Sequence, residues 1–118
     1  MESGDYHRTT FALNDAVMPV FGEQIHKKLE KSYSMKSLHL QYTPSTAKVY
    51  LSTESSRIES SVFPTGPVDQ RQTPAVFHNY SQGFLGYIGD VNNERGSQAL
   101  LFAMLGTFFL PFRIIDPF

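Results

Sequence analysis

Four histidines and a short Arg-Gly-Ser sequence are the residues of this 118-residue chain whose types could do chemistry. His7, His26, His39 and His78 lack the close spacing, such as His-Glu-x-x-His, with which neighbouring histidines hold zinc. The sequence therefore predicts no metal site and no cofactor. Catalysis would need groups that meet only in the folded chain. His39 and His78 are the first pair to test, because both fall in predicted strands.

Other catalytic patterns are also missing from the sequence. No serine stands in a Gly-x-Ser-x-Gly sequence, and the eleven acidic residues are scattered through polar turns and along one helix face. The chain contains no cysteine, which removes disulfides, thiolate catalysis and cysteine-ligated metals. These absences leave an enzyme unsupported and favour a non-catalytic protein.

Arg95, Gly96 and Ser97 stand where a C-terminal helix is predicted to begin. Free backbone amides and the positive end of the helix dipole would meet a guanidinium there, a combination that can hold an anion. The simpler interpretation is that Ser97 caps the helix and Arg95 is exposed. A small regulatory or ligand-binding module with an anion site at 95–97 is therefore one alternative function.

An apolar run at residues 99–110, closed by Pro111, is the most hydrophobic part of the chain. It is too short for a membrane span, because a helix needs about 20 apolar residues to cross a bilayer. Extending the run to the C-terminus brings in Arg113 and Asp116, which are costly inside a bilayer. Peripheral contact of residues 99–118 with a membrane stays open as a second alternative.

The helix predicted at 97–110 carries more apolar side chains than a small sheet can cover. A surplus of this kind usually marks an interface. The leading prediction is a structural or assembly subunit that self-associates or docks into a larger complex through this helix and the aromatic tail. The expected contact residues are Leu101, Met104, Leu105, Phe108, Phe109 and Phe112.

An amphipathic helix is predicted over residues 15–33. Its apolar positions recur every fourth residue and share one helical face, while the opposite face is mostly charged. Asn14 or Asp15 can cap its N-terminus. The positions on the apolar face are Val17, Phe21, Ile25, Leu29 and Tyr33.

Strands are predicted where apolar and polar residues alternate or β-prone residues gather. Residues 37–42 and 47–53 form a first hairpin, and 75–80 and 84–88 form a second. A weaker strand is expected at 57–63, where polar residues separate the apolar ones.

These elements predict an α+β fold: a mainly antiparallel sheet of four to five strands with the two helices packed on it. Residues 1–13 are expected to be a flexible N-terminal arm. Residues 14–118 are expected to form a single domain with a long loop at 64–74, which is either a mobile excursion or a binding element.

The overall composition fits a folded protein of about one domain. Hydrophobic residues make up 41% and charged residues 18%, with a net charge of -1. Without a basic excess, nucleic-acid binding is disfavoured. The polar N-terminus lacks the apolar segment of a secretory signal, so we expect an intracellular, cytoplasmic protein.

Overall fold

The computed structural model describes residues 1–59, 66–80 and 82–115. For residues 80 and 108–115 it describes the backbone only. It confirms the α+β class: five antiparallel strands lie in two sheets, with short N-terminal helices and a C-terminal helix packed on them. The strands are β1 (Glu2–Leu13), β2 (Ser32–Gln41), β3 (Tyr50–Leu51), β4 (Ala75–Tyr80) and β5 (Gly83–Ile88); the helices are α1 (Met18–Phe21), α2 (Glu23–His26) and α3 (Arg95–Ile115).

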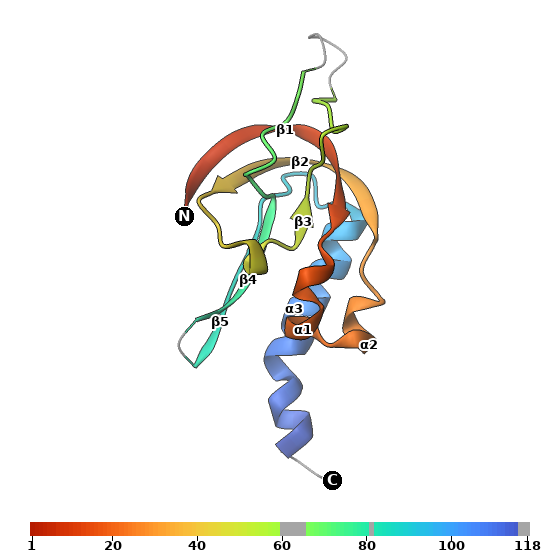
Figure 1. The fold of residues 1–118 in the computed structure, drawn as a ribbon. Helices are drawn as coiled ribbons and strands as arrows, with labels where there is room; N and C mark the ends of the chain where they lie inside the picture. Colours follow the sequence, from red (N-terminus) through yellow and green to blue (C-terminus); the bar gives the residue numbers. More distant parts are fainter. Residues whose placement is uncertain (60–65, 81, 116–118) are drawn as a thin grey trace.

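The first sheet has the order β2-β1-β3, with the N-terminal strand at its centre. The prediction of a flexible arm at 1–13 is therefore wrong, because β1 pairs with β2 over almost its whole length. His7, Thr9 and Phe11 point inward at alternate positions, and the long β1–β2 pair arches over the other strands and the helices (Figure 1). The alternation is masked in the sequence because two of these inward residues are polar.

The first predicted hairpin is not formed. Residues 37–42 lie mostly in β2, whose partner is β1, and the strand expected at 47–53 shortens to β3, which also pairs with β1. Of the weak strand expected at 57–63, Arg57 makes a single antiparallel bridge to Pro67, and residues 60–63 lie outside the described part. Both β2 and β3 therefore pair with the distant N-terminal strand β1 and not, as the pattern predicted, with each other.

The single helix expected at 15–33 is also wrong. A 3₁₀ turn at Asp15–Val17 leads into α1 and then α2, and the chain after them becomes β2. Gly22 separates α1 from α2 with a φ of 84° and a ψ of 155°, a conformation that essentially only glycine adopts. Phe21 and Leu29 are still buried as the periodicity predicted.

Replacing Gly22 with alanine should lower the free energy of unfolding by about 1–3 kcal/mol, because alanine must adopt a strained backbone there. A Cβ atom at this position would meet nothing within 4 Å, so the loss is a backbone effect and not a clash. Gly106→Ala is the matched control: it should gain about 0.5–1 kcal/mol in the α3 interior. Urea unfolding measures both, and equal effects would contradict the explanation.

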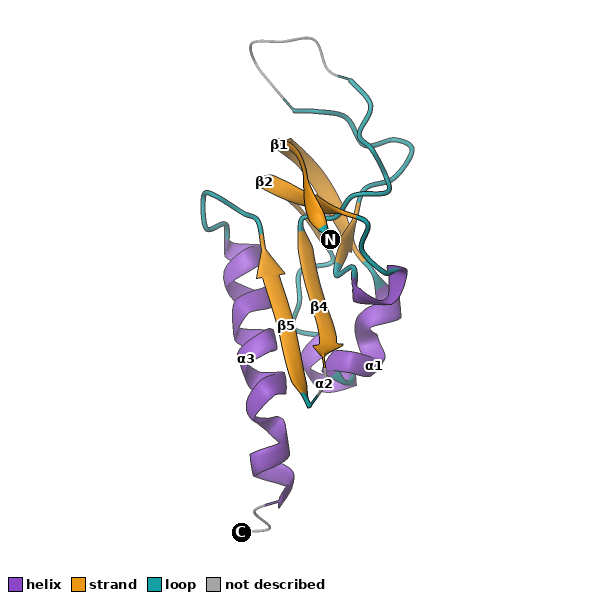
Figure 2. Cartoon of the chain, turned by 90° about the vertical axis from the view of Figure 1, so that its left-hand side faces the viewer, coloured by secondary structure: helices purple, strands orange, loops and turns teal. Residues whose placement is uncertain are grey.

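The second predicted hairpin and the C-terminal helix are confirmed. β4 and β5 pair from Ala75–Ile88 to Tyr80–Gly83, and α3 lies along β5 and beside the short helices (Figure 2). α3 starts at Arg95 and runs five residues past the predicted end at 110. The core between these elements contains Phe11, Val17, Phe21, Met35, Tyr50, Phe77, Leu100 and Met104.

Much of the described part of the predicted 64–74 loop is packed against the body. Val68, Gln72 and Thr73 are buried. The side chain of Gln72 accepts a hydrogen bond of 2.7 Å from the backbone amide of Asp5. Thr73 exchanges backbone hydrogen bonds with Leu40 of β2. Residues 66–74 therefore tie β1 and β2 to the start of β4; residues 64 and 65 lie outside the described part.

Candidate functional site

The helix α3 has one buried face and one exposed apolar face. Its buried positions follow the helical period and include Leu100, Ala103, Met104 and Thr107. The exposed fractions of the neighbouring apolar side chains are 48% for Leu101, 72% for Phe102 and 46% for Leu105. Three large apolar residues thus lie together at the surface of one helix.

A groove of about 320 Å³ runs between α3 and the β4–β5 hairpin. Most of its walls are aromatic or aliphatic, and both Leu101 and Leu105 border it. The lining residues are Phe77, Phe84, Gly86, Tyr87, Ile88, Leu101, Met104 and Leu105. We call this groove, together with the exposed side chain of Phe102, the α3–β5 surface.

A stack of three phenylalanine rings supports the hairpin wall of the groove. Phe77 of β4 is stacked on Phe21 of α1 at a centroid distance of 4.9 Å, and on Phe84 of β5 at the same distance. On β5, Gly86 faces α3: a Cβ atom there would lie 3.1 Å from the sulfur of Met104. The stack fixes the hairpin, and the absence of a side chain at Gly86 lets it approach the helix.

The structure brings together three of the six predicted contact residues, Leu101, Met104 and Leu105. Met104 is buried and belongs mainly to the core, whereas the two leucines are half exposed. The backbones of Phe108, Phe109 and Phe112 lie in α3, and their side chains lie outside the described part, as does the rest of the aromatic tail.

Two features of this surface were missed from the sequence. Phe102 was not assigned to the contact set, although its offset from Leu100 and Met104 on the helix already placed it away from the buried stripe. The hairpin wall, with Phe84 and Ile88, had no local signal because its proximity to α3 is a tertiary contact.

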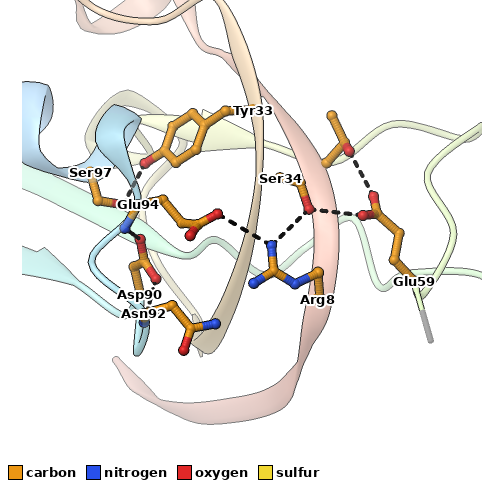
Figure 3. Close-up of polar contacts among 9 residues, drawn as sticks. Arg8, Tyr33, Ser34, Glu59, Asp90, Asn92, Glu94 and Ser97 are labelled. Atoms are coloured by element: carbon orange, nitrogen blue, oxygen red, sulfur yellow. Dashed lines mark hydrogen bonds and ion pairs between the residues drawn. The ribbon is translucent and has the colours of Figure 1, made fainter. Parts of the chain in front are cut away.

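In the predicted anion site at Arg95, Gly96 and Ser97, the last two residues are buried against Tyr33. The hydroxyl groups of Ser97 and Tyr33 share a hydrogen bond of 2.8 Å (Figure 3). Gly96 is buried against the same ring, which a Cβ atom would approach to 2.6 Å. Arg95 is exposed, as predicted, but the prediction that Ser97 caps the helix is wrong, because α3 already begins at Arg95. The predicted anion site therefore lies at a helix start where the Ser97 hydroxyl already has a hydrogen-bond partner.

Carboxylates already occupy the surroundings of this helix start. Asp90 accepts hydrogen bonds of 2.8 and 2.7 Å from the backbone amides of Asn92 and Glu94 (Figure 3). Burial raises the pKa of Tyr33 to about 12, and the negative charges of Asp90 and Glu94 act in the same direction. This local negative charge disfavours a bound anion.

A polar network connects this region to the first sheet. Arg8 donates a hydrogen bond of 3.2 Å to Ser34 and lies 3.4 Å from the carboxylate of Glu94. Ser34 and Thr10 in turn donate to Glu59 at 2.8 and 2.6 Å (Figure 3). The network joins β1, β2, the loop after β3 and the residue before α3, and its geometry is that of a structural connection.

His39 lies next to His7 and not next to His78. The His7 and His39 rings are 4.5 Å apart and edge-on, and the Phe11 ring lies 5.2 Å from that of His39. Burial lowers the pKa of His39 to about 4. In the part of the chain that the structure describes, no group of three His, Cys, Asp or Glu residues could hold a metal ion.

A smaller polar hollow of about 200 Å³ lies near the end of β2, beside Tyr42 and Lys48. Its charges are already engaged. Asp69 pairs with the Arg71 guanidinium at 3.0 Å, which holds the pKa of that carboxyl well below its usual range. Lys48 donates a hydrogen bond of 3.0 Å to the backbone carbonyl of Arg71. The hollow therefore offers a ligand less free charge than its composition implies.

Among the helices in the described ranges, none combines the length and the hydropathy that crossing a membrane requires. Comparison of this chain with protein-family models, with curated proteins and with solved structures finds no match.

Proposed function

We propose that this protein is a non-catalytic interaction subunit that binds a protein partner through the α3–β5 surface. The proposal depends on one observation: Leu101, Phe102 and Leu105 are exposed side by side on a helix that borders an apolar groove. Single exposed apolar residues are common on folded proteins, but adjacent ones beside a groove are typical of binding surfaces.

Burial of this surface would provide the driving force for association. Each square ångström of apolar surface removed from water contributes about 25 cal/mol, and a phenylalanine can bury about 150–250 Å². Phe102 alone could therefore contribute several kcal/mol before the entropic cost of association. Aromatic residues, phenylalanine among them, are enriched at protein interfaces.

The chemistry of α3 favours a protein partner over a membrane surface. Helices that lie on membranes carry lysine and arginine on their polar face, which contacts anionic lipid headgroups. The only basic residues in the α3 sequence are Arg95 and Arg113, and the helix face opposite Leu101 and Leu105 is buried in the core. An apolar groove beside a helix suits the side chains of another helix.

A photoreactive phenylalanine analogue at position 102 tests this proposal in cells that express the full chain. Illumination should produce a covalent adduct with a protein from position 102. The matched control is the same analogue at Tyr42, an aromatic position with an almost equal exposed fraction of 73% that lies away from α3. Equal adducts at both positions, or none at 102, would contradict the proposal, and an adduct with phospholipid would favour peripheral membrane contact.

A further inference from the structure

The α3–β5 surface contains both a projecting group and a recess. Phe102 projects from α3 with most of its side chain exposed, and the adjacent Leu101 lines the groove. In a two-fold symmetric dimer the same patch meets itself, so each copy must supply both halves of every contact. A patch with an exposed aromatic ring beside an apolar groove meets that requirement.

We infer that the partner is a second copy of this chain, in a two-fold dimer where Phe102 of each copy enters the groove of the other. This inference rests on the proposed function and specifies its partner. The groove has room for the ring, since its volume of about 320 Å³ is within the range of pockets that hold small molecules, about 300–1,000 Å³.

The distribution of charge supports a second copy. Residues 96–112 of α3 contain no charged residue, so two copies of this helix can approach without like-charge repulsion. The net charge of the whole chain is -1, so the two molecules also repel each other little at long range. Conversely, a strongly charged partner would find no complementary charge along this stretch.

The area of contact indicates that the groove must take part. The 21 residues of α3 make a helix about 31 Å long and about 10 Å wide, a footprint of about 300 Å². A typical stable interface buries about 800 Å² on each partner, so one helix face is too small. Insertion of Phe102 beside β5 brings the hairpin of each copy into the contact.

Equilibrium sedimentation of the purified full chain tests the inference. The wild-type protein should form a dimer, Phe102→Ala should weaken dimerisation at least about tenfold, and Tyr42→Ala should leave it unchanged. Circular dichroism should show that Phe102→Ala is folded, because this side chain is exposed. A wild-type monomer at every concentration, or equal dimerisation of the Phe102→Ala variant, would overturn the inference.

Photo-crosslinking in the same purified protein locates the contact. The analogue at position 102 should label residues 84–88 or 101–105 of the second copy, and labelling elsewhere would overturn the arrangement. The two proposals fail separately: a monomeric protein that forms an adduct with a different protein in cells refutes the dimer and leaves the interaction subunit standing. Absence of any adduct at 102 in cells refutes the proposed function itself.

Discussion

Lowering the pH from 6.5 to 4 should remove about 3 kcal/mol from the free energy of unfolding through His39 alone. Only 1% of this residue is exposed, and its burial lowers the pKa to about 4. The rings nearest to it belong to His7 and Phe11, which supply no negative charge for an imidazolium. The folded chain therefore resists a proton that the unfolded chain accepts.

The direction of the effect follows from which state takes up the proton. Well above pH 6.5 the imidazole of His39 is neutral in both states, so it adds no pH dependence there. Between pH 6.5 and 4 mainly the unfolded chain is protonated, so stability falls with decreasing pH by at most about 1.4 kcal/mol per pH unit. The pKa of His7 is also lowered by burial, although Asp5 opposes the shift, and it adds a loss of the same sign.

Urea unfolding at several pH values compares the wild type with His39→Asn. Carboxylates titrate in both proteins, so the difference between the two pH profiles isolates His39. The variant should have the flatter profile. His78→Asn, at a partly exposed position on β4, is the control for replacing a histidine with asparagine. Parallel profiles for wild type and His39→Asn would contradict the assignment.

The parts of the fold that the sequence predicted correctly are those specified by local patterns. The β4–β5 hairpin follows from two strand-like segments separated by a short turn, and α3 follows from a long apolar run after a polar turn. In both cases the residues that pair or pack against each other are close in the sequence. Local propensity and tertiary structure therefore agree there.

The errors occurred where distant segments decide the structure. β1 passes between β2 and β3, so both strands pair with an N-terminal segment whose inward positions include His7 and Thr9. The helix predicted at 15–33 correctly gave Val17, Phe21 and Leu29 as buried, but Gly22 allows a break that periodicity alone does not reveal. Polar residues at inward positions therefore made the β1 strand hard to predict, because they break the apolar alternation. A single glycine divided the predicted helix into two short ones.

For the candidate site, the helix side was predictable and the hairpin side was not. Leu101 and Leu105 were among the expected contact residues because the helix carries more apolar side chains than a small sheet can cover. Phe84 and Ile88 became part of the surface only through the packing of β5 against α3. Sequence patterns can therefore indicate that a surface exists, while its shape depends on tertiary contacts.

Replacing Phe77 with alanine should lower the free energy of unfolding by about 3–5 kcal/mol. The ring is buried and stacked between Phe21 and Phe84, with interplanar angles of 13° and 6°. Its removal would leave a cavity and end both stacking contacts, which connect α1, β4 and β5. A loss of this size is a large part of the total stability of a domain, about 5–15 kcal/mol. Chemical denaturation measures it.

Two further variants distinguish the phenylalanine stack from the binding surface. Leu85→Ala changes an exposed residue on the other face of the same hairpin and should cost less than about 1 kcal/mol. An equal loss for Phe77→Ala and Leu85→Ala would contradict a structural role for the stack. Because Phe77 also lines the groove, its replacement should weaken both folding and association. Phe102→Ala should weaken association alone, since its side chain lies outside the core, and this contrast separates the residue that builds the groove from the residue that we propose binds in it.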